Sequence, residues 1–298
     1  SARPMEFSLF YFASSESEPQ AAAQDKYRLL IEGARFADEH EFTAVWTPER
    51  HFHAFGGLYP NPSVISASLA LITKKVGLRA GSVVLPLHSS IRVAEEWAVV
   101  DNLSGGRVGV SFASGWHAND FVLSPESYGE RQKVMYERIE EVRRLWRGEA
   151  LTLRDGAGTE TAIRTLPRPV QAELPLWVTA AGSVETFRSA GRIGAGLLTH
   201  LLGQSVEELG AKVEAYREAW REAGHERESR VSVSRSIFAL VDDRDRAYFG
   251  RGSDDADHVG YLDEKTKAIF GRSYAAEPDV LVKQLADDMA IQAADTLL

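Results

Sequence analysis

Residues 76–113, VGLRAGSVVLPLHSSIRVAEEWAVVDNLSGGRVGVSFA, contain one complete unit of the fold. The run from Val76 to Leu85 is apolar almost throughout, which is typical of a strand that is buried on both faces. Residues 91–103 follow with the pattern of a helix, which the pair Gly105–Gly106 ends. A second apolar strand is predicted at 108–113. This order of strand, helix and strand indicates a parallel βαβ unit.

The same alternation continues in both directions along the chain. Further strands are predicted at 5–12, 43–46, 176–180, 196–199, 231–241 and 294–298. Helices are predicted between them at 25–41, 62–73, 130–146, 183–190, 205–220 and 278–289. Eight strands in a chain of 298 residues, most of them followed by a helix, favour an α/β fold of the (β/α)8 TIM-barrel type. The runner-up is a doubly wound open sheet, which usually needs fewer units.

We interpret residues 5–298 as a single barrel domain. Residues 1–4, SARP, resemble a linker or a tag remnant, and the final AADTLL has the composition of a strand that has only begun. The barrel is therefore expected to be truncated at its last strand, as in a domain excised from a longer polypeptide. Residues 242–276 are polar and contain glycine, and we interpret them as an excursion from the barrel.

The composition excludes several classes of protein. Acidic residues outnumber basic ones by 43 to 34, and a net charge of −9 argues against binding to nucleic acid or to an anionic membrane. No apolar run is long enough to cross a bilayer, and the N-terminus lacks the pattern of a signal peptide. The absence of cysteine excludes disulfides, thiolate catalysis and iron–sulfur clusters, and it fits a cytoplasmic location.

A crowded polar segment, TPERHFHAFGG (residues 47–57), follows the predicted strand at 43–46. Parallel barrels carry their functional groups on the loops after the strands, so Glu49, Arg50, His51 and His53 are expected at the mouth. Imidazole titrates near neutral pH and is suited to proton transfer.

The pair His51 and His53 also keeps a metal-dependent hydrolase open, because an H-x-H pattern after a barrel strand can supply two ligands. Other loops carry further histidines, namely His88, His117 and His200. A binuclear hydrolase needs an aspartate at a later strand end, and none occurs at the expected place. We therefore assign no metal ligand.

A second polar loop, Ala181–Thr186, joins a predicted strand to a helix. The first turn of a helix has free N–H groups and a partial positive charge, so it can hold a phosphate together with the hydroxyls of Ser183 and Thr186. The alternative is that Ser183 only caps its own helix. Ser114, after the strand at 108–113, can supply another hydroxyl or can simply form a turn with Gly115. The sequence GRIGAG at 191–196 follows a helix rather than a strand, so it does not predict a dinucleotide site.

Three tryptophans, Trp46, Trp116 and Trp177, lie at or near strand ends. Each alone is more typical of packing than of cofactor contact, but together they suggest a wide, partly aromatic mouth that can hold a flat ring.

Three segments carry a resemblance to a known family. They are PERHFHAFGG (48–57), GSVVLPLHSSIRVAEEWAVVDNLSGGRVGVSFASGW (81–116) and LPLWVTAAGSVETFRSAGRIGAGLLTHLLGQ (174–204). The chain resembles the bacterial luciferase-like FMN-dependent monooxygenases over most of residues 5–240. Within them it is most similar to the subgroup that occurs as domains in nonribosomal peptide and polyketide synthases.

The resemblance implies a cofactor site for reduced FMN (FMNH2) at the carboxyl end of the barrel. Ser183 and Thr186 match the family's phosphate-binding hydroxyls, with Gly182 beside them, and Ser114 matches a further phosphate contact. Gly81 and Ser82 match a non-proline cis peptide beside the flavin ring.

One position departs from the family pattern. Luciferase has two histidines after its glutamate, and Arg50 replaces the first of them, which is catalytic there. Arginine does not act as a base near neutral pH, but it can stabilise an anion. The proton-transfer residue is then expected to be His51 or His53; the alternative is that Arg50 pairs structurally with Glu49 or another acid.

The resemblance further implies a two-component reaction. A separate NAD(P)H:flavin reductase supplies FMNH2, and O2 forms a C4a-(hydro)peroxyflavin that oxygenates the substrate. From the subgroup we expect an acyl, aminoacyl or peptidyl thioester on a carrier protein, in natural-product biosynthesis. A deazaflavin (F420)-dependent oxidoreductase of the same fold and a non-catalytic flavin-binding domain are the alternatives. By analogy, a homodimer is expected through the helices beside the second and third strands.

Overall fold

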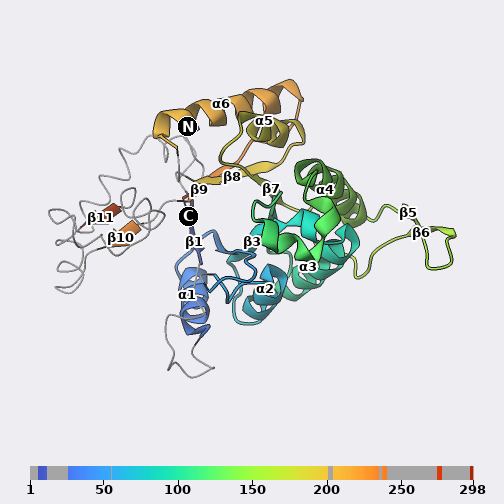
Figure 1. The fold of residues 1–298 in the computed structure, drawn as a ribbon. Helices are drawn as coiled ribbons and strands as arrows, with labels where there is room; N and C mark the ends of the chain where they lie inside the picture. The colour runs from blue at the N-terminus through green and yellow to red at the C-terminus, as the bar shows by residue number, and fades with distance from the viewer. Residues whose placement is uncertain are drawn as a thin grey trace. The chain divides into compact units, whose positions relative to one another are not determined.

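The computed structural model describes residues 6–11, 26–54, 56–200, 204–234, 237–239, 274–276 and 296–297 (Figure 1). The chain divides into two compact units, one of residues 7–179 and one of residues 1–6 with 180–298. Residues 1–4, the predicted helix at 278–289 and all of 242–276 except its last three residues lie outside the described residues. The interpretation of 5–298 as one barrel domain stays a prediction.

The larger unit is built around a parallel sheet with the strand order β1-β2-β3-β4-β7. These strands are β1 (Glu6–Phe10), β2 (Ala44–Thr47), β3 (Gly77–Val84), β4 (Val108–Ala113) and β7 (Leu176–Thr179). All four residues of β2 are buried, as expected for a strand covered on both faces. The pairing of β3 with β4 shifts its register between Gly81 and Val83, close to the ends of these strands.

Four helices follow the strands of this unit: α1 (Arg28–Glu39), α2 (Pro62–Ala70), α3 (Ser90–Ser104) and α4 (Arg131–Arg147). α2 packs on α3, and α3 packs on α4 (Figure 1). Pro62 stands in the first turn of α2, where a missing N–H is tolerated. Gly105 ends α3 in the left-handed conformation, with φ of 67°. The predicted boundaries of these helices therefore agree with the structure to within a few residues.

Short 3-10 turns connect some of these elements: η2 (Leu85–Leu87), η3 (Ala118–Leu123) and η4 (Pro125–Ser127). A hairpin of β5 (Leu151–Arg154) and β6 (Glu160–Ile163) follows α4 and extends away from it (Figure 1). The sequence did not predict this hairpin, because its strands are short and mostly exposed and so lack an apolar run.

The smaller unit contains a parallel sheet in the order β8-β9-β12. Its elements are α5 (Val184–Arg192), β8 (Gly196–His200), α6 (Val206–Glu222), β9 (Val231–Ser234) and β12 (Thr296–Leu297). The predicted capping box of α6 is present: the amide of Glu208 donates to Ser205 Oγ at 3.1 Å, and the amide of Ser205 donates to Glu208 Oε2 at 2.8 Å.

The predicted single strand at 231–241 is wrong in one respect. Its described residues form two strands, β9 and β10 (Ile237–Ala239), and β10 pairs with β11 (Tyr274–Ala276) rather than with the sheet of β8 and β9. Among the described helices, none has both the length and the apolar character that a membrane crossing requires.

Candidate active site

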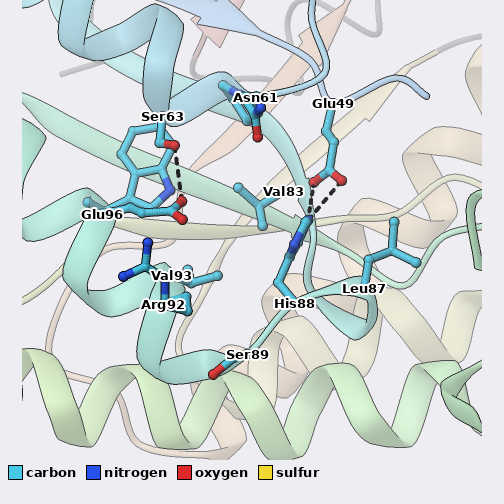
Figure 2. A pocket seen from close by; sticks show the side chains of 12 residues that line it. Glu49, Asn61, Ser63, Val83, Leu87, His88, Ser89, Arg92, Val93 and Glu96 are labelled. Atoms are coloured by element: carbon cyan, nitrogen blue, oxygen red, sulfur yellow. Dashed lines mark hydrogen bonds and ion pairs between the residues drawn. The ribbon is translucent and has the colours of Figure 1, made fainter. Parts of the chain in front are cut away.

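A buried carboxylate, Glu49, organises the loop that follows β2. Only 1% of its side chain is exposed. Its Oε1 accepts a hydrogen bond from the amide of Val84 at 2.9 Å, and His88 Nε2 lies 2.9 Å from Oε1 and 2.8 Å from Oε2 (Figure 2). His51 Nε2 lies in short hydrogen-bonding contact with Oε2. The cluster Glu49–His51–His88 therefore joins the end of β2 to the end of β3.

Local backbone geometry brings these side chains together. Phe52 adopts the left-handed conformation, with φ of 62°, which turns the chain immediately after His51. The amide of Arg50 donates to the carbonyl of Tyr59 at 2.9 Å, so the loop closes on itself. A Cβ at Gly56 would lie 2.7 Å from Arg50 Cγ, so this glycine makes room for the arginine side chain.

The His88 side of the cluster is held by α4. Arg138 Nη1 donates to the carbonyls of Pro86, at 2.9 Å, and His88, at 2.7 Å. An arginine that satisfies two carbonyls of one short turn fixes the direction in which the histidine points. The sequence placed His88 on a loop but gave no sign that it would bind Glu49, since the two lie 39 residues apart.

The electrostatics of the cluster follow from this pairing. Burial opposes ionisation of Glu49, but hydrogen bonds from His51 and His88 outweigh it and lower the pKa of the carboxyl. Burial likewise opposes protonation of His88, but its bond to Glu49 outweighs burial and raises the pKa of the imidazole. The pair is thus a carboxylate and an imidazolium over the pH range between the two ordinary values.

These shifts predict how stability depends on pH. The contribution of Glu49 to the free energy of unfolding is present above its unfolded pKa and is lost in acid. The contribution of His88 is present below about pH 6.5 and is lost as the pH rises through its higher folded pKa. As the pH rises above about 6.5, wild type should therefore lose more free energy of unfolding than His88→Gln does. Urea denaturation of both proteins across this range measures the difference. Parallel curves would show that His88 titrates as it does in the unfolded chain.

The three side chains are also of the types that bind metals. Their ligand atoms lie within 4.8 Å of one another. However, the two contacts between His88 Nε2 and Glu49 measure 2.8 and 2.9 Å, and Val84 adds an amide donor to the same carboxylate. These are hydrogen-bond distances between donor and acceptor, whereas ligands around a tetrahedral ion avoid such direct contact with each other.

His53 does not join the Glu49 cluster. Its ring is exposed and meets the ring of His117 edge to face, with 4.8 Å between the centroids. His117 Nδ1 lies 3.9 Å from Asp120 Oδ1, and neither atom has a hydrogen-bond partner. The predicted site residues of this loop therefore separate: Glu49 and His51 lie in the cluster with His88, whereas His53 lies in a second group of titratable side chains.

The peptide bond between Gly81 and Ser82 is cis, as the resemblance predicts. A Cβ at Gly81 would lie 2.7 Å from Phe10 and 3.0 Å from Trp46, so only glycine fits here without movement of its neighbours. Ser82 Oγ is in short contact with Thr179 Oγ1, which lies 2.7 Å from Ser111 Oγ. The sequence did not predict this chain of three hydroxyls, which crosses three strands.

The packing interpretation is confirmed for two of the three tryptophans, so the aromatic mouth that the three suggested together is wrong for those two. Trp46 is fully buried, Trp177 is 4% exposed, and their rings meet edge to face at 5.0 Å. Arg79 lies over both rings, 5.1 Å from Trp46 and 4.6 Å from Trp177. These two tryptophans therefore belong to the core. Trp116, by contrast, is 64% exposed.

Ser114 follows β4 and is half-buried. The glycine after it, Gly115, has φ of 81°, and a Cβ there would lie 2.9 Å from the Phe121 ring. Ser114 therefore precedes a tight turn that packs against η3. This position is compatible with either interpretation made from the sequence.

The start of α5, in the smaller unit, is where the sequence predicts a phosphate site. Ser183 is the residue before the helix, yet its side chain makes no capping hydrogen bond, so the alternative that it only caps α5 is wrong. No heavy atom lies within 4 Å of a Cβ built at Gly182. Lys212 of α6 donates to the carbonyl of Ala181 at 3.1 Å, which brings an ammonium group to the same turn. Sequence reasoning missed Lys212, which lies on the following helix.

Residues 5–251 match the family described as luciferase-like monooxygenase. The chain belongs to this family. It is therefore an enzyme of the luciferase-like monooxygenases, as the resemblance predicts, and the metal-dependent hydrolase loses its support.

A relative with a known reaction is the oxygenase component of a flavin-dependent trigonelline monooxygenase from Acinetobacter baylyi. It is 33% identical over 181 residues, which are 59% of this chain and 49% of that protein. A match of this extent leaves the reaction of the present chain to be proposed.

Solved structures show the same fold. The monooxygenase RslO1 from Streptomyces bottropensis has a TM-score of 0.82 and 24% identity, with 98% of this chain and 91% of that chain covered. The oxygenating constituent of 3,6-diketocamphane monooxygenase from Pseudomonas putida, in complex with FMN, has a TM-score of 0.76 and 18% identity, with 99% and 91% covered. An F420-dependent secondary alcohol dehydrogenase has a TM-score of 0.72 and 19% identity, with 98% and 92% covered. The predicted luciferase-like α/β fold is confirmed.

Proposed function

We propose that this chain is the oxygenase component of a two-component monooxygenase that uses reduced FMN and O2. Family membership supports a flavin-type monooxygenase, and the start of α5 is the observation that supports a cofactor with a phosphate group. The trigonelline relative is itself named as an oxygenase component, which supports a separate NAD(P)H:flavin reductase as the partner.

The residues at the start of α5 fit the phosphate of FMN. The hydroxyls of the uncapped Ser183 and of Thr186 are hydrogen-bond donors, as are the amides that open a helix, and the space beside Gly182 leaves the backbone accessible. Lys212 adds a positive charge. In the larger unit, we propose that Gly81, Ser82 and Ser114 contact the flavin, as the resemblance implies.

Reduced flavin, when bound, supplies the two electrons that activate O2. The chain's own contribution is to exclude water, to stabilise negative charge and to move a proton. We propose that Arg50 stabilises the negative charge that develops during oxygen transfer. His51, whose Nε2 is oriented by Glu49, is the proposed proton-transfer residue, and His53 is proposed to face the substrate because it is exposed.

Replacing Arg50 by alanine should separate oxygen consumption from product formation. Loss of one positioned charge that acts on the transition state typically costs about 10²–10³ in rate. We expect reduced flavin to be consumed with release of hydrogen peroxide while oxygenated product falls. Arg50→Lys, which keeps the charge, should retain part of the product. Wild-type coupling in the alanine variant would assign Arg50 to the structure of the loop alone.

The proposed substrate is an acyl, aminoacyl or peptidyl thioester on a carrier protein of a nonribosomal peptide or polyketide synthase. The sequence resemblance carries this part, and the exposed Phe52, His53 and Trp116 offer an apolar and polar surface for such a group. Incubation of loaded carrier proteins with the chain, FMN, NADH and a flavin reductase under ¹⁸O₂ tests it. Mass spectrometry should find ¹⁸O in a carrier-bound or released product. If a free small molecule became labelled and no carrier-bound thioester did, the carrier-bound substrate would be refuted.

A homodimer is also proposed, through α2 and α3. Large apolar side chains are exposed on these helices, namely Val64 at 60%, Val99 at 44% and Leu103 at 47%. Exposed apolar side chains that gather into a patch mark an interaction surface. Sedimentation equilibrium should give twice the chain mass, and Leu103→Glu should shift it toward the mass of one chain. A wild-type mass of one chain would exclude the dimer.

A further inference from the structure

A cavity of about 250 Å³ lies beside the Glu49–His51–His88 cluster, between α2, α3 and the end of β3. Figure 2 shows Glu49 and His88 at one end of it and Ser63 and Glu96 at the other. The proposed reaction uses none of the residues at the far end.

The lining of this cavity suits water. Asn61, Ser63, Ser89 and Glu96 supply polar groups, and Ser63 Oγ donates to Glu96 Oε2 at 3.1 Å. A liquid water occupies about 30 Å³, so several molecules fit and find partners. Arg92, which also lines the cavity, has 68% of its side chain exposed, so this end reaches the protein surface.

Two of the three members of the cluster have little access to solvent. The exposed fraction is 1% for the Glu49 side chain and 11% for that of His51. The hydrogen-bonded route for a proton that His51 takes up or releases therefore starts at its bonded neighbour, Glu49. Glu49 is bonded to both histidines, and His88, which is 30% exposed, lines the cavity. An imidazole can accept a proton on one nitrogen and release it from the other.

Glu96 is suited to the outer position of such a path. Burial lowers the pKa of His88, and the bond to Glu49 raises it. The negative charge of Glu96 adds a smaller increase, so Glu96 and His88 interact across the cavity. Glu96 is half-buried and lies one helical turn from the exposed Arg92. A carboxylate at this point can exchange protons with both cavity water and bulk water.

We propose that the cavity is a hydrated proton path, in which His51, Glu49 and His88 pass a proton through cavity water to Glu96 and the solvent. Only a proton moves along this path. Each side chain accepts one proton and releases one, so its protonation state is the same before and after the transfer. The path rests on the proposed function, because it serves the proton transfer assigned to His51. Its test, however, needs neither flavin nor substrate.

The test measures how fast the ring N–H protons of His51 and His88 exchange with water, by NMR of the ¹⁵N-histidine-labelled chain. Ser63→Leu places a large apolar side chain in the cavity, and Glu96→Gln removes the outer carboxylate while keeping its shape. Since one positioned acid or base is typically worth about 10²–10⁴ in a proton transfer, each variant should slow exchange by at least about tenfold.

Two matched controls lie on the same helices but do not line the cavity. Ser68→Leu changes an α2 serine that is bonded within its own helix, and Glu95→Gln changes the neighbour of Glu96. Both controls should exchange at the wild-type rate. If Ser63→Leu fails to fold, Glu96→Gln decides, and a small acid such as formate in the buffer should restore its exchange.

Unchanged exchange in Glu96→Gln, or equal slowing in the Glu95→Gln control, would overturn the path. These outcomes are distinct from a failure of the proposed function, which would appear as an inability to bind reduced flavin with the exchange results intact.

Discussion

Replacing Glu49 by alanine should lower the free energy of unfolding by about 3–5 kcal/mol, the cost of removing one partner from a buried charged pair. The loss is large because three hydrogen-bonding groups depend on Glu49. His51, His88 and the amide of Val84 all bond to this one carboxylate, which is almost fully buried. Each would be left without its acceptor. Urea denaturation at about pH 6, where the pair is charged, measures the loss.

The same substitution should also reduce oxygen transfer by a factor of about 10²–10⁴, since His51 would lose the group that orients it. Glu49→Gln is the control for shape: it keeps the volume but removes the charge, so it should fold better than the alanine variant while remaining poorly active. A loss of stability below about 1 kcal/mol in Glu49→Ala would show that the cluster is not held by this carboxylate.

Replacing Ser183 and Thr186 together by alanine should weaken FMN binding by at least about 10²-fold. Hydrogen bonds to a charged group are worth about 1.5–3 kcal/mol each, and 1.4 kcal/mol corresponds to a factor of ten in affinity. Riboflavin lacks the phosphate, so its affinity should stay the same. Isothermal titration with both ligands gives the two values directly.

Ser189→Ala is the matched control, because this serine lies on α5 beyond its first turn, where its Oγ accepts a hydrogen bond from Arg192 at 3.4 Å. It should bind FMN as wild type does. Equal weakening of FMN and riboflavin in the double variant would indicate a disturbed helix, and unchanged FMN binding would place the phosphate elsewhere.

The sequence was informative where local pattern determines structure. The apolar runs at β3 and β4, with the glycines that end α3, gave both strands and the intervening helix with nearly correct limits. The β5–β6 hairpin was missed because exposed strands carry no apolar run. Residues 43–49 alone likewise predicted that Glu49 lies at the end of a buried strand.

The sequence did not predict which side chains that are distant along the chain come into contact. His88 reaches Glu49 because the bulged end of β3 and the turn held by Arg138 direct it there. Lys212 reaches the start of α5 because α6 packs on α5. Trp46 and Trp177 lie at strand ends, where a mouth was expected, but their rings turn inward and enclose Arg79. Each of these facts depends on side-chain direction after packing, which periodicity does not encode.

The central claim is that this enzyme binds reduced FMN and uses it with O2. Anaerobic titration of the chain with FMNH2 and, in parallel, with reduced F420, followed by rapid mixing with O2, tests it most directly. We predict saturable binding of FMNH2, weaker binding of reduced F420, and a rate of flavin reoxidation that differs from that of free FMNH2. Tighter binding of reduced F420, or no binding of FMNH2 with reoxidation at the rate of the free flavin, would contradict the account.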